Sequence, residues 1–74
     1  MTAHEWLEAF AARLGVDPPT SEELRVLLEL AGEAAHTSQR IAAPVACWLS
    51  ARAGRSPAEA LAIARELGAG IEEG

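Results

Sequence analysis

The chain has no lysine and a single cysteine. All six of its basic side chains are arginines, which is typical of GC-rich bacterial coding bias and indicates no function. The lone thiol, Cys47, excludes an internal disulfide. No segment approaches the roughly 18 consecutive apolar residues of a membrane span, and no secretory signal is visible. We therefore expect a cytoplasmic protein that does not enter a membrane.

Positive charge is also scarce. Six arginines stand against eleven acidic residues, which gives a formal net charge of −5. An acidic chain is repelled by phosphate backbones and by anionic membrane surfaces. The sequence contains no basic run of the kind that nucleic-acid readers carry. Nucleic-acid and membrane binding are therefore disfavoured.

The length leaves little room for a core. Seventy-four residues make one domain, residues 1–74, and a single core of this size is marginal. Half of the residues are hydrophobic, but many are alanines, which bury little area. Limited stability favours self-association or a partner, so a homodimer is one of the states we consider.

Helix-start signals dominate the rest of the chain, and strand alternation and repeats are missing. A hydroxyl followed three residues later by glutamate forms a capping box, in which each side chain satisfies the other residue's N–H. The pattern occurs three times: "TAHE" at Thr2–Glu5, "TSEE" at Thr20–Glu23 and "SPAE" at Ser56–Glu59. It predicts helices over 3–14, 21–36 and 57–67, with Gly15 and Gly68 as stops and 68–74 as a frayed tail.

A further helix is placed by Pro44, which fits only in the first turn. This helix should begin between Arg40 and Ala43 and end near Gly54. The fold class is therefore all-α, a compact bundle of four short helices. We expect Gly32 to mark close helix packing. Val26 and Leu30 lie off the main stripe of their helix, which suggests a central helix covered on more than one side. The expected inward faces are Leu7, Phe10 and Leu14; Leu24, Leu27, Leu28, Ala31 and Ala35; Val45, Trp48 and Leu49; and Leu61, Ala64 and Leu67.

A polar cluster separates the second and third predicted helices: His36, Thr37, Ser38, Gln39 and Arg40. The first N–H groups of a helix lack intrahelical partners, so a phosphate or carboxylate could bind at the start of the third helix. The alternative is structural. His36 would then interact with the helix dipole, Thr37 or Ser38 would cap the third helix, and Arg40 would pair with Glu33 or another acid.

Catalytic and metal-binding patterns are weak. Cys47 and His36 are the only nucleophile and base worth pairing, and a cysteine inside an apolar helix is usually a small core residue. Together with His4 they are too scattered for a zinc site. We expect no enzyme activity, no metal and no cofactor. Trp6 and Trp48 either fill the core or form an interface, where tryptophan is enriched.

The stretch "LLELAGEAAHTSQRIAAPVACWLSARAGRSPAEALAIARELG", with its lead-in "EWLEAFAARLGVDPP", resembles a small helical domain family of unknown function found mainly in actinobacteria. The most specific segments are "AAH", "R", "AAPVACWL" and "AG". That family is similar to the C-terminal extension of some molybdenum cofactor guanylyltransferases. The resemblance implies an accessory role and gives weight to His36, Arg40, Pro44 and Trp48. It does not imply guanylyltransferase activity, because the glycine-rich nucleotide loop has no counterpart here.

These observations favour a non-enzymatic accessory domain in molybdenum cofactor (molybdopterin guanine dinucleotide) metabolism. Its partner would be a molybdenum cofactor enzyme or a maturation factor. The alternative is a small-molecule binder that holds a phosphorylated or pterin-type anion at the start of the third helix. The candidate binding residues for either function are His36, Thr37, Ser38, Arg40 and Trp48.

Overall fold

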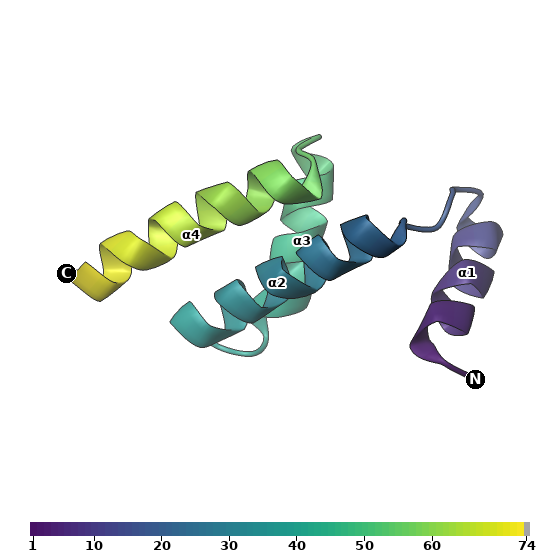
Figure 1. Cartoon of the computed structure of the whole chain (residues 1–74), viewed down its shortest axis with the longest axis horizontal. Helices are drawn as coiled ribbons and strands as arrows, with labels where there is room; N and C mark the ends of the chain where they lie inside the picture. The colour runs from purple at the N-terminus through teal and green to yellow at the C-terminus, as the bar shows by residue number, and fades with distance from the viewer. Residues whose placement is uncertain (74) are drawn as a thin grey trace.

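The computed structural model describes residues 1–73 of the chain, with side chains through Gly70. It is an all-α bundle, as the sequence predicts, and this part of the chain contains no strand. Figure 1 shows the arrangement of the helices. The four helices are α1 (Ala3–Leu14), α2 (Ser21–Thr37), α3 (Ala42–Arg52) and α4 (Pro57–Glu73).

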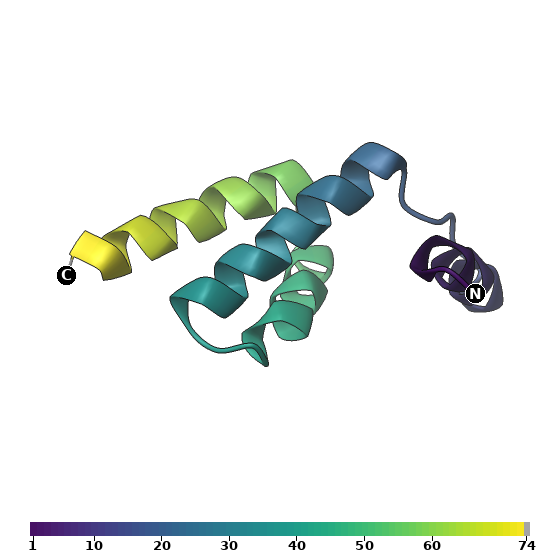
Figure 2. The ribbon, with the colours of Figure 1, turned by 60° about the horizontal axis from the view of Figure 1, so that its bottom comes forward.

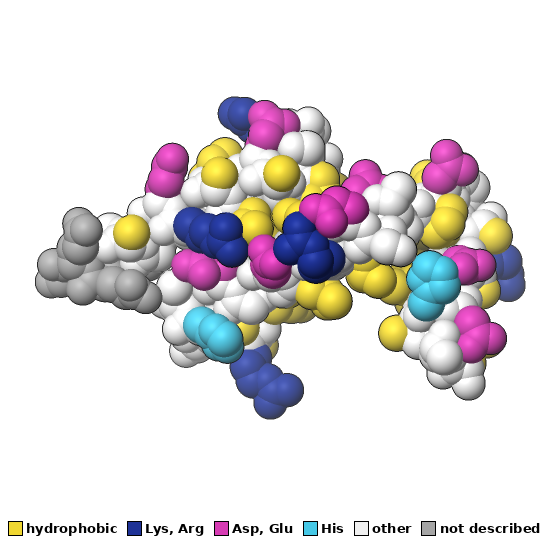
Figure 3. Space-filling model, viewed as in Figure 1, with side chains coloured by type: hydrophobic (Ala, Val, Ile, Leu, Met, Phe, Trp, Pro, Cys, Tyr) yellow, Lys and Arg dark blue, Asp and Glu magenta, His cyan; other side chains and the backbone are white. Residues whose placement is uncertain are grey.

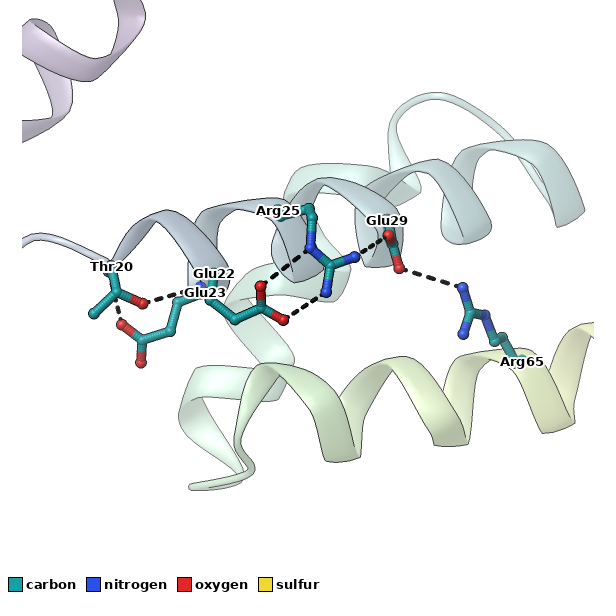
Figure 4. Close-up of polar contacts among 6 residues, drawn as sticks. All are labelled: Thr20, Glu22, Glu23, Arg25, Glu29 and Arg65. Carbon is teal, nitrogen blue, oxygen red and sulfur yellow. Dashed lines mark hydrogen bonds and ion pairs between the residues drawn. The ribbon is translucent and has the colours of Figure 1, made fainter.

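The three predicted capping boxes are all present. At the start of α2, the Glu23 N–H donates to Thr20 Oγ1 at 3.0 Å, and the Thr20 N–H donates to Glu23 Oε1 at 2.8 Å (Figure 4). The same reciprocal pairs join Thr2 to Glu5 and Ser56 to Glu59. Each box gives hydrogen-bond partners to two backbone N–H groups at a helix start. This is why the sequence places these starts correctly.

The start of α3 follows the constraint set by proline. Pro44 lies in the first turn of the helix, and Ile41 is the capping residue, without a side-chain hydrogen bond to the helix. At the other end Gly54 takes a positive φ of 71°, a conformation that glycine adopts without strain. The predicted bounds of this helix are confirmed.

Helix α2 is the centre of the bundle. It packs extensively against both α3 and α4, and no other pair of helices within residues 1–73 does so. Figures 1 and 2 both show α2 and α4 side by side and running in the same direction, with α3 crossing α2 on another side. The central position predicted from Val26 and Leu30 is therefore confirmed.

The core is small and lies where α2 meets α4. Val26 and Leu30 of α2 pack against Ala60 and Leu61 of α4. Leu30 is the most buried of these, with 2% of its surface exposed. Partly buried side chains surround the cluster: Leu27, Cys47 and Ala64.

Several residues expected to face inward are exposed. Leu28 is 64% exposed and Leu67 is 66% exposed, and Phe10 and Leu14 are also largely exposed. Those predictions were wrong because the apolar stripes are wider than the neighbouring helices that cover them. On α3 the inward side instead carries small side chains, and the predicted inward residues lie outside: Val45, Trp48 and Leu49.

Two glycines do not have the roles expected of them. Gly68 does not end α4, which continues to Glu73, so the tail expected over 68–74 is helical as far as it is described, and Gly74 lies outside the described residues. A Cβ at Gly68 would lie 2.6 Å from Glu33 Oε1 and 3.0 Å from the Thr37 methyl group. Close packing therefore occurs at Gly68, whereas a Cβ at Gly32 would meet nothing within 4 Å.

A charged network crosses the outer face of α2 and α4. Arg25 pairs with Glu22 and with Glu29 at 2.6 Å, and Glu29 also reaches Arg65 of α4 at 3.3 Å (Figure 4). Figure 3 shows these basic and acidic side chains alternating across the middle of this face. The pairs are exposed, so water screens them and each contributes little to stability.

None of the helices within residues 1–73 combines the length and the hydrophobicity that crossing a membrane requires.

Candidate functional site

In the polar joint between α2 and α3, the hydroxyl groups form hydrogen bonds to backbone carbonyl oxygens of α2. The Thr37 hydroxyl donates to the Glu33 carbonyl oxygen at 2.8 Å, and the Ser38 hydroxyl donates to the Ala34 carbonyl oxygen at 2.7 Å. Both side chains therefore complete the C-terminal end of α2. The expectation that one of them caps α3 was wrong, because these hydroxyls reach back to the carbonyls four residues earlier.

The first N–H groups of α3 already have backbone partners. Ala42 N–H donates to the Gln39 carbonyl oxygen at 2.9 Å, and Ala43 N–H donates to the Arg40 carbonyl oxygen at 3.1 Å. Such tight turns satisfy part of the helix start without a ligand. The geometry thus gives an anion fewer free donors than the sequence suggested.

The other predicted joint residues do not converge. His36 is exposed in the last turn of α2, and Arg40 is exposed with no carboxylate in ion-pair distance among the side chains of residues 1–70. The expected Arg40–Glu33 pair is therefore not formed. An open hollow lies beside the joint, but its lining is largely apolar and omits His36, Thr37 and Arg40. It is formed by Ser38, Gln39, Ile41, Ala42 and Val45.

The clearest surface feature is the side of α3 that faces away from α2. We call it the outer stripe of α3, formed by Ile41, Val45, Trp48 and Arg52. Ile41 is 75% exposed and Trp48 is 57% exposed. The Arg52 guanidinium lies over the Trp48 ring, 5.0 Å from its centroid. This cation–π contact holds the indole in place on the surface.

A second apolar feature lies between α3 and α4, where both helices pack on α2. Two adjoining hollows of about 280 and 340 Å³ share five of their lining residues, and together we call them the α3–α4 groove. The residues common to both hollows are Leu30, Ala46, Leu49, Ala64 and Leu67. Ile63 and Arg55 line one end. Ile63 was not assigned to a face from the sequence, although it lies four residues before Leu67, a spacing that places both on one side of the helix.

Helix α1 carries a third exposed apolar surface. The rings of Trp6 and Phe10 stack with centroids 4.9 Å apart. Trp6 is 52% exposed and Phe10 is 47% exposed, so neither fills a core. Both tryptophans thus lie on the surface, and the interpretation that they pack in the core was wrong. The domain is too thin to enclose them.

The charges are distributed unevenly along the chain. The segment from Arg40 to Ser56, which contains α3, has three arginines and no acidic residue. The remaining three arginines stand with all eleven acids. The surface around α3 is therefore locally basic within an acidic domain.

Groups with reactive chemistry are not assembled in the described part of the chain. Burial raises the pKa of the Cys47 thiol, so less of the reactive thiolate is present near neutral pH. Within the same part, no three His, Cys, Asp or Glu side chains cluster in a way that could hold a metal ion. The features that remain are surfaces for contact.

A family comparison agrees with the small-domain character of the chain. Residues 1–73 match the model of a domain of unknown function, DUF6457. Because the match extends over nearly the entire chain, the protein belongs to this family. A search of curated proteins and a search of solved structures gave no match.

Proposed function

We propose that the protein is a non-enzymatic interaction domain that binds a partner protein through the outer stripe of α3. One observation carries this proposal. Helix α3 is apolar on nearly all sides, yet it is covered only where it meets α2. A helix that is apolar all round normally lies inside a protein or an assembly. The uncovered side of α3 is therefore the surface that a partner would bury.

The chemistry of this stripe indicates the kind of partner. Trp48 lies near the middle of the stripe, and Arg52 stacks on it at 5.0 Å. Tryptophan and arginine are the residue types most enriched at binding hot spots. The surrounding segment is basic, with Arg40 and Arg55 as its other charges. The matching surface is an apolar patch bordered by acidic side chains.

The resemblance noted in the sequence supports a more specific setting. In this proposal the partner is a molybdenum cofactor enzyme or a maturation factor, and the complex forms in the cytoplasm of an actinobacterium. The domain would act as an accessory factor, since the chain resembles an extension found on some molybdenum cofactor guanylyltransferases. This setting rests on the resemblance alone, whereas the binding surface rests on α3.

The second candidate, a phosphorylated or pterin-type ligand at the start of α3, has less support. The hydroxyls of Thr37 and Ser38 bind α2 carbonyls. The N–H groups of Ala42 and Ala43 bind backbone oxygens. Arg40 is left as an exposed cation without convergent donors beside it.

The test is affinity purification of the tagged protein from extract of its source organism, with Trp48→Ala as the variant. Recovery of a molybdenum cofactor enzyme or maturation factor with the wild type, and its loss with Trp48→Ala, is the expected result. The matched control is Leu28→Ala, because Leu28 is as exposed as Trp48 but lies on α2. Equal recovery with all three proteins would refute the proposed surface, and recovery of unrelated proteins only would refute the setting.

A further inference from the structure

Helix α1 has an apolar face that nothing in the described chain covers. Trp6, Phe10 and Leu14 are all about half exposed or more, although they share one side of the helix. Helix α1 does not pack extensively against any other helix, and Figures 1 and 2 show it standing away from the other three. A helix of 12 residues is marginal in water without packing. A surface that covers this face is therefore needed.

The α3–α4 groove is a receptor of suitable shape and chemistry. Its floor is Leu30, the most buried residue of the core, and its walls are Leu49 of α3 and Leu67 of α4. Both walls are more than half exposed. The two hollows adjoin and are lined mainly by apolar side chains, a surface that the apolar face of an amphipathic helix can cover.

The exposed area indicates how much surface remains to be covered. The chain exposes 5662 Å². A compact monomer of 7.8 kDa exposes about 4,400 Å², so the excess is about 1,300 Å². A stable interface buries about 800 Å² on each partner. The excess is thus sufficient for a dimer interface.

The connector between α1 and α2 favours a second copy over the chain's own α1 as the occupant. Pro18 and Pro19 fix their own φ angles, and each keeps the preceding residue extended. This extended segment carries α1 away from the other three helices, as Figures 1 and 2 show, and leaves its apolar face available to a second copy. Stiff connectors of this kind favour exchange of an element between two copies.

We propose that two copies of the protein exchange their α1 helices, so that the Trp6–Phe10–Leu14 face of each lies in the α3–α4 groove of the other. The exchange is reciprocal and produces a two-fold symmetric dimer. It uses the groove, to which the outer stripe of α3 contributes only Val45, and it leaves Ile41, Trp48 and Arg52 exposed. The Trp48→Ala test above and the dimerisation test below therefore report on different residues.

The experiment is sedimentation equilibrium of the full chain from about 1 to 200 µM, a range that brackets typical weak dimers. The wild type should dimerise. Phe10→Asp on α1 and Leu67→Asp in the groove should each weaken dimerisation on the order of tenfold or more. Leu28→Asp is the matched control, because it adds the same charge at an equally exposed site on α2 and should change nothing. Circular dichroism confirms that each variant is helical.

Mixing the two variants distinguishes exchange from any other dimer. A mixed pair has one contact between wild-type α1 and a wild-type groove, so association should be restored relative to either variant alone. A monomeric wild type would overturn the proposal. So would a dimer insensitive to either variant, a dimer disrupted by both variants but not restored by mixing, or an effect of Leu28→Asp equal to theirs.

Discussion

Replacing Gly32 by alanine should stabilise the protein. Gly32 lies in the interior of α2 and has no positive φ. A Cβ added there would meet nothing within 4 Å, so the new methyl group neither clashes nor fills a gap. The only change left is in the backbone, because glycine has more conformational freedom to lose than alanine when the chain folds.

The magnitude follows from helix propensity. Alanine is favoured over glycine by about 0.8–1.0 kcal/mol in a helix interior. For a domain of 60–100 residues, 1 kcal/mol corresponds to a rise in Tm of about 4–8 °C. We therefore expect Gly32→Ala to raise Tm by an amount in this range.

The assay is thermal unfolding followed by circular dichroism at one fixed protein concentration, with Gly68→Ala as the control. Gly68 is also helical, but its Cβ would lie 2.6 Å from Glu33 Oε1 and 3.0 Å from the Thr37 methyl group. The Glu33 carboxylate can move away, but the Thr37 methyl group at 3.0 Å must also shift, and this cost should offset part or all of the gain in propensity. Tm should therefore rise less than for Gly32→Ala. A lower Tm for Gly32→Ala, or an equal rise for both variants, would refute the assigned packing of α2 and α4.

Three further predictions concern the core, the helix caps and the joint. Leu30→Ala should lower the free energy of unfolding by about 2–5 kcal/mol, because Leu30 is 2% exposed. A urea titration should show that the variant is already largely unfolded before urea is added. Hydrogen bonds from Ser56 lower the pKa of Glu59 from its ordinary 4.5. The ionised carboxylate therefore stabilises the fold above pH 4.5, and this stability should be lost as the pH falls further. Glu59→Gln should make Tm less dependent on pH in this range. Arg40→Ala should change Tm by less than about 2 °C, because this exposed side chain makes no ion pair within the described residues, and a larger drop in differential scanning fluorimetry would show a structural role.

Local signals in the sequence predict where the helices begin. Three capping boxes and the position of Pro44 place all four helix starts within about one residue. These signals act over three or four residues, so they do not depend on the rest of the fold. The predicted end of α4 was wrong, because the helix continues through Gly68, which packs against α2. This contact joins segments that are distant in the sequence, so local signals do not reveal it.

The inward faces were harder to predict for a different reason. On α3, alanines face α2 while Val45 and Trp48 face outward. A prediction that turns the largest apolar side chains inward therefore gives this helix the opposite orientation. Periodicity identifies an apolar face but does not say whether this chain or another one covers it. The polar joint was likewise visible as a cluster, but the direction of the Thr37 and Ser38 hydroxyls depends on where α2 ends.

The central position of α2 has a consequence for how the domain opens. Because α3 and α4 both pack on α2 and not extensively on each other, neither can remain docked once α2 unravels. Amide hydrogens around Leu30 should therefore exchange with solvent only when the whole three-helix unit unfolds. Those of α1, in a protomer whose α1 is not docked, should exchange through openings that leave the rest intact. The order of amide exchange would thus show that α1 opens first and that α2, α3 and α4 unfold together.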